Sequence, residues 1–271
     1  NLCSIKQRRE MKTSTTILAL LFFVSISSDL FAQTFEDLIQ EGDKYNTEFQ
    51  HQKSLESYQK ADKLKPANWE VLWRMSRAIV DIANKMPEET DEQKDAKFSK
   101  YRKSFVYADS AVKLASDQSV TYLRRAIVNG RIALFQGVFS AIGTVDDVKS
   151  DSERAIQLNN GGNYVQALSH YVLGRTHAKV CEKSYLVRLP LGLGWGDMEV
   201  AIRELQNAVK LKPNFRMFHL ELAKAYIEEG EYELAKENLL LVEKAPFVLE
   251  DDEEYLKEAK QLLKEVNKEL E

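Results

Sequence analysis

Apolar positions recur along most of the chain at spacings of three and four residues. The C-terminal segment 251–271 shows this clearly, because one apolar stripe runs through otherwise charged residues. The stripe consists of Leu256, Ala259, Leu263, Val266 and Leu270. A stripe of this kind lies on one face of an α-helix and is stable when another helix covers it. The pattern predicts a C-terminal amphipathic helix and, continued along the chain, an all-α fold.

Four short segments in the chain repeat one another. Each begins with Ala, has Leu three positions later and then reaches a residue that ends a helix. They are ADKLKPAN from residue 61, AVKLASDQ from 111, AIQLNNGG from 155 and AVKLKPNF from 208. Their starts lie 50, 44 and 53 residues apart. Recurrence at this period is typical of helical-repeat arrays, in which each unit packs on the next.

Small and aromatic residues alternate through the first and last units in a fixed order. In the first unit they are Gly42, Tyr45, Ser54, Tyr58, Ala61 and Pro66, and in the last they are Leu222, Ala223, Tyr226, Gly230, Tyr232, Ala235 and Leu239. Small residues let two helices approach closely, and large ones fill the space beside them. The order resembles the tetratricopeptide repeat, a pair of antiparallel helices.

The middle units exceed the usual tetratricopeptide length of about 34 residues. Polar or glycine-rich insertions at 87–95 and 189–197 account for much of the excess, and Gly137 and Gly143 interrupt the third unit. We predict a tetratricopeptide-type α-α superhelix of about five helix pairs. The repeat array is assigned to residues 33–250, and the helix at 251–271 is predicted to cap its open end.

From Leu173 onwards the chain resembles the regulator of microtubule dynamics family. The resemblance rests on LGR at 173–175, AIRELQNAVKLKPNF at 201–215, AKAYIEEGEYELAKENL at 223–239, Pro246 and the acidic final helix. It implies an all-helical protein interaction module without catalytic residues. Residues 69–163 match the family only loosely.

A targeting segment is predicted at residues 1–32. Lys12 follows Met11, the apolar run ILALLFFVSI occupies 17–26, and cleavage is expected after Ala32. We therefore expect an exported protein, periplasmic or envelope-associated in a Gram-negative cell and secreted otherwise. An uncleaved anchor is the alternative, although the run is shorter than the roughly 20 residues that span a bilayer. On this expectation the family's link to microtubules is not carried over.

Composition excludes several classes of function. The 271 residues carry a formal net charge of -4, so a nucleic-acid partner is not expected. No Ser, His and acid arrangement is singled out by spacing, so no enzyme is predicted. GLGWG at 192–196 lacks the strand and Lys of a phosphate loop, and LEDDEE at 249–254 lacks the alternating oxygen ligands of a calcium loop. No cofactor is expected.

Three potential metal ligands share one helix face. His170, His177 and Cys181 are separated by seven and four residues. Two of them occupy positions at which tetratricopeptide repeats carry packing aromatics, and a single straight helix brings three ligands to one ion only with difficulty. We interpret them as packing residues rather than as a zinc site.

The inner face of the predicted superhelix offers the candidate binding surface. Arg77, Arg175 and Lys224 share the ninth position of the repeat pattern in three units, where the other two units carry Asp43 and Ile127. The fifth position adds Trp73, Tyr171 and Leu220. Cations beside aromatics suit an extended peptide that presents acidic side chains or a free C-terminus. The simpler alternative is that they are ordinary solvated side chains.

The sequence therefore predicts an exported, non-enzymatic scaffold that binds a protein or peptide in a concave groove. The runner-up is a structural subunit of a cell-envelope assembly that uses its convex face or its capping helix. The two hypotheses differ in which face carries the partner.

Overall fold

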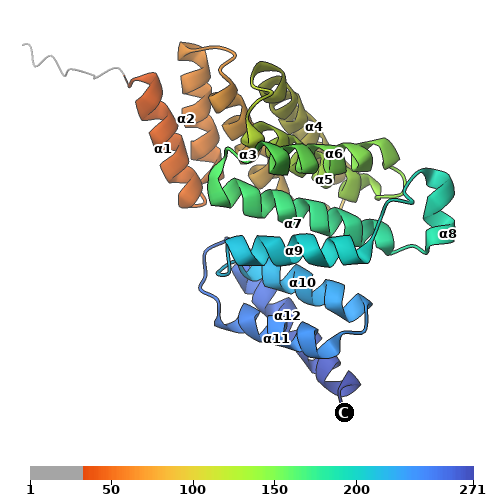
Figure 1. The fold of residues 1–271 in the computed structure, drawn as a ribbon. Helices are drawn as coiled ribbons and strands as arrows, with labels where there is room; N and C mark the ends of the chain where they lie inside the picture. The colour runs from red at the N-terminus through yellow and green to blue at the C-terminus, as the bar shows by residue number, and fades with distance from the viewer. Residues whose placement is uncertain (1–32) are drawn as a thin grey trace, which may run out of the picture. The chain divides into compact units, whose positions relative to one another are not determined.

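Helices pack in antiparallel pairs throughout the part of the chain that the computed structural model describes, residues 33–271. The pairs are α1 (Phe35–Thr47) with α2 (His51–Leu64), α3 (Trp69–Asn84) with α4 (Asp91–Leu114), α5 (Ser119–Gln136) with α6 (Ile142–Leu158), α7 (Gly162–Cys181) with α9 (Met198–Leu211), and α10 (Arg216–Glu228) with α11 (Tyr232–Lys244). The helix α12 (Asp252–Glu269) follows, and the α7–α9 connection contains α8 (Tyr185–Arg188) and the 3-10 turn η1 (Leu189–Leu191). These helices form one unit from Thr34 to Glu271 (Figure 1).

The first helices of successive pairs lie beside one another. α3 contacts α5, α5 contacts α7, α7 contacts α10, and α12 continues the row by packing on both α10 and α11. We call the surface built by α3, α5, α7, α10 and α12 the inner face. The predicted all-α tetratricopeptide-type solenoid is confirmed.

Helix ends follow from local side chains. Thr34 and Asp37 form a capping box at α1, and Thr90 with Gln93 forms another at α4. The second box places the start of α4 inside the polar insertion at 87–95. Gly230 turns the chain between α10 and α11 with φ of +76°, a conformation that costs glycine little.

Small side chains allow the helices of a pair to pack closely. The alanines that open the four repeated segments, Ala61, Ala111, Ala155 and Ala208, are all fully buried. Gly174 lies where α7 meets α9, and a Cβ there would stand 2.8 Å from the Ala201 carbonyl oxygen. The recurring small residues therefore mark helix contacts, as the pattern predicts.

None of the helices within 33–271 combines the length and the apolar character needed to cross a bilayer.

Candidate functional site

Trp73 lies at the centre of a group of arginines on the inner face. The guanidinium carbons of Arg74, Arg77 and Arg124 lie 4.3, 5.1 and 5.5 Å from its ring centroid. Trp73, Arg74 and Arg77 lie in α3, and Arg124 lies in α5. These two helices are in contact, which brings the four side chains together. We call these four residues the Trp73 cluster. Cations stacked on an indole offer both a charged and an apolar surface to a ligand.

Asp43 of α1 balances part of this charge. It accepts hydrogen bonds from Arg74 Nε at 3.1 Å and from Arg77 Nη2 at 2.9 Å, and the Tyr58 hydroxyl donates to it at 2.7 Å. Burial opposes ionisation of Asp43, but the bond from Tyr58 and the two guanidinium groups hold its pKa below the usual value. Arg77 is therefore anchored within the fold.

Arg124 differs from its neighbours because no acid pairs with it. It is 8% exposed, and no carboxylate within residues 33–271 lies within ion-pair distance. Its buried Nε atom has no hydrogen-bond partner in that part of the chain. Burial and the nearby Arg77 charge lower its pKa. Tyr164 and the more distant Asp81 carboxylate offset only part of this effect. Burying a cation without a carboxylate in direct contact is costly, and a ligand could supply that carboxylate.

The other predicted cations are already neutralised. Arg175 Nε lies 3.5 Å from Glu221, and Lys224 Nζ lies 3.3 Å from Glu221 and 2.7 Å from Glu258 of α12. Their charges are shared with the fold's own acids and are less available to a partner.

Two predicted contact residues lie in the core. Tyr171 is 6% exposed, with its ring centroid 5.1 Å from that of Phe218, and Leu220 is 1% exposed. Both pack against other core side chains, so we omit them from the proposed contact surface. The structure instead adds Arg74 and Arg124, which the pattern positions miss. A usable signal is that Arg124 precedes Ile127 by three residues and so shares its helix face.

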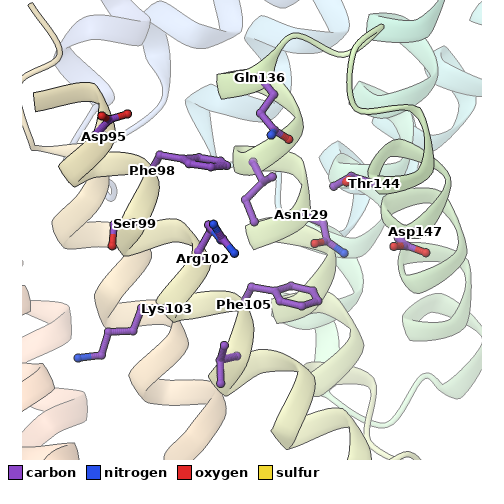
Figure 2. A pocket seen from close by; sticks show the side chains of 12 residues that line it. Asp95, Phe98, Ser99, Arg102, Lys103, Phe105, Asn129, Gln136, Thr144 and Asp147 are labelled. Atoms are coloured by element: carbon purple, nitrogen blue, oxygen red, sulfur yellow. The ribbon is translucent and has the colours of Figure 1, made fainter. Parts of the chain in front are cut away.

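Residues of α4, α5 and α6 line a hollow of about 870 Å³ (Figure 2). Phe98 and Phe105 of α4 form apolar walls, with Arg102 between them, and Asp147 of α6 stands opposite. Asn129 of α5 lines it and is 4% exposed. We call this surface the α4–α6 hollow. Its lining combines apolar groups with both signs of charge, so it does not single out one ligand chemistry.

The three potential metal ligands have separate packing partners. His170 Nδ1 lies 2.6 Å from Glu204, and His177 is 4% exposed with its ring edge-on to Trp195 at 5.0 Å between centroids. Cys181 is a partly buried free thiol. Burial lowers the pKa of His177 and raises that of Cys181. Within residues 33–271 no three His, Cys, Asp or Glu side chains are grouped to hold a metal ion.

Replacing Cys181 by serine is expected to leave the zinc content of the purified protein at zero. It should lower the free energy of unfolding by about 1 kcal/mol, because a hydroxyl replaces a partly buried thiol. Elemental analysis and urea unfolding measure the two effects. Stoichiometric zinc that disappears in the Cys181→Ser variant would contradict the packing interpretation.

The paired helices, the small residues at their contacts and the continuous inner face define a tetratricopeptide-repeat scaffold, a class of proteins that offers extended surfaces for binding other proteins. Within that class, the chain belongs to the regulator of microtubule dynamics protein 1-3 family, which it matches over residues 38–267.

Curated relatives support this assignment. Regulator of microtubule dynamics protein 3 from Rattus norvegicus and from Mus musculus are each 24% identical over 200 residues, or 70% of this chain. The chain spans 40% of the length of each relative.

Solved structures support the fold. A tetratricopeptide-repeat protein from Thermus thermophilus superposes with a TM-score of 0.58 at 16% identity, covering 85% of this chain and 99% of that one. Yeast Tom70 gives a TM-score of 0.52 at 16% identity, covering 88% of this chain and 41% of Tom70.

The expectation of export is wrong. The relatives that overturn it are named as regulators of microtubule dynamics, and microtubules lie inside the cell. Residues 1–32, on which the expectation was based, lie outside the described residues.

Proposed function

We propose that this protein is a non-enzymatic scaffold that binds an acidic peptide or protein segment on its inner face. The observation that supports the proposal is Arg124, a buried guanidinium with no carboxylate partner beside the exposed part of Trp73. A ligand carboxylate would supply the missing counter-charge, and the indole would contact an apolar neighbour in the ligand.

Arg77, Arg175 and Lys224 remain part of the proposed surface in a secondary role. Each already has an acidic neighbour in the fold, so each contributes less to affinity than Arg124 does. Because these contacts are partly exposed, affinity should fall as salt rises.

The relatives' names suggest a first partner to test. They are named for microtubule dynamics, so we propose that tubulin and proteins bound to microtubules be included among the candidates. This chain spans less than half of each relative, and the activity of the whole relative is therefore itself part of the proposal.

Site-specific photo-crosslinking tests which face binds. Trp73 is replaced by p-benzoylphenylalanine in the full chain, and a matched variant carries the same group at Phe105 in the α4–α6 hollow. We expect a partner from cell extract to be captured from position 73 and not from 105, with the crosslinked segment rich in Asp and Glu. Capture from 105 alone would replace the proposal with a scaffold that binds its partner through the α4–α6 hollow.

A further inference from the structure

The turn between α11 and α12 touches the opposite end of the array. Glu250 Oε2 lies 2.8 Å from Nε2 of His51, the first residue of α2, and 3.7 Å from Lys85 Nζ. Lys85 also donates a hydrogen bond to Asp251. Glu250 is 199 positions from His51, and Asp251 is 166 positions from Lys85. The turn after the last pair of helices is therefore joined to the first two pairs. We call His51, Lys85, Glu250 and Asp251 the clasp.

Hydrogen bonds within the turn fix the position of its carboxylates. Asp252 is fully buried and accepts hydrogen bonds from the backbone N–H groups of Val248 at 2.6 Å and Leu249 at 2.7 Å. Arg216 donates to the carbonyl oxygens of Ala245 and Pro246. The turn is therefore built as a rigid support for two adjacent acids.

Lys85 of the clasp continues the line of the Trp73 cluster along α3. His51 Nδ1 lies 3.8 Å from Asp81, and the Asp81 charge also acts on Arg77 and Arg124. Lys85 directly follows α3, eight residues after Arg77, so the two positions are about 12 Å apart along the helix axis. An extended segment of about four residues covers that distance.

We infer that His51 and Lys85 form a second carboxylate-binding site on the inner face, which the protein's own Glu250 and Asp251 occupy until a partner with adjacent acidic residues displaces them. This inference rests on the proposed function, because it assigns regulation to the same surface.

The exposure of the Lys85 ion pairs makes their displacement feasible, whereas the His51 side chain is only 11% exposed. The side chain of Lys85 is 42% exposed, and those of Glu250 and Asp251 are 34% and 33% exposed. Ion pairs this exposed contribute little to stability and exchange partners readily. Glu250 and Asp251 act as an internal competitor that sets a threshold for acidic partners.

The test compares two variants that change net charge equally. Glu250→Gln with Asp251→Asn removes the internal acids, whereas Glu253→Gln with Glu269→Gln changes two exposed acids of α12 outside the clasp. The probe is a fluorescein-labelled hexaglutamate peptide, with binding followed by anisotropy. Hydrogen–deuterium exchange reports whether residues 246–256 are released.

We expect the clasp variant to bind the probe about tenfold more tightly than the wild type, with faster exchange at 246–256. The control should change neither property by more than about twofold. Equal probe binding by wild type and clasp variant would overturn the clasp while leaving the groove proposal standing. Absence of probe binding in every protein, including the wild type, would overturn both.

Discussion

Replacing Gly174 by alanine should lower the free energy of unfolding by about 3 kcal/mol. A Cβ at this position would lie 2.8 Å from the Ala201 carbonyl oxygen and 2.8 Å from Leu205 Cγ, both in α9. Separations under 3.0 Å force one group to move, and a backbone carbonyl inside a helix moves only together with the helix. Relief therefore requires α7 and α9 to separate, which loosens the fourth of the five helix pairs.

Gly143 provides the matched control. It lies in α6, and a Cβ there meets no atom within 4 Å. Gly143→Ala should raise the free energy of unfolding by up to about 1 kcal/mol, because alanine favours the helix and restricts the unfolded chain. Urea unfolding followed by circular dichroism measures both variants. Equal changes in the two would contradict the close α7–α9 contact.

Features that depend on local pattern are predictable from this sequence. The alanine of each repeated segment and the glycine of LGR mark helix contacts, because close packing needs small residues at a fixed spacing. The apolar stripe through Leu263 and Val266 likewise predicts α12, since the stripe must be covered. Each of these inferences uses residues close to one another in the chain.

The electrostatics of the inner face depend on contacts between distant residues. Their shared position in the repeat pattern places Arg77, Arg175 and Lys224 on one face. How much of their charge a ligand can use depends on acids in other helices. Lys224, for example, pairs with Glu258 of α12. The repeat pattern carries no information on which acid faces which base. For the same reason it does not reveal the contact between Glu250 and His51.

Arg124→Met should abolish most of the binding while leaving the fold as stable as the wild type or more stable. Arg124 is buried without a carboxylate partner, so an apolar side chain of similar length removes a desolvation cost and is expected to raise the free energy of unfolding by about 1 kcal/mol. Loss of a charge-assisted contact to the ligand should weaken affinity by about 2 kcal/mol, or roughly 30-fold.

The adjacent arginine supplies the contrasting variant. Arg125 donates to Asp151 and to Asp109, each at 2.8 Å, and Asp151 is 4% exposed. Burial raises the pKa of Asp151 even with the guanidinium beside it, so Asp151 depends on that pairing. Arg125→Met should therefore lower the free energy of unfolding by about 3 kcal/mol. At temperatures where it remains folded, Arg125→Met should bind the hexaglutamate peptide with the affinity of the wild type.

Urea unfolding and anisotropy with the hexaglutamate peptide separate the two roles. We expect Arg124→Met to lose binding and Arg125→Met to lose stability. That pair of results would mean that the unpaired Arg124 serves a ligand and that the paired Arg125 serves the fold. If Arg124→Met instead destabilises the protein and binds the peptide like the wild type, Arg124 is a structural residue and the inner face loses its central anchor.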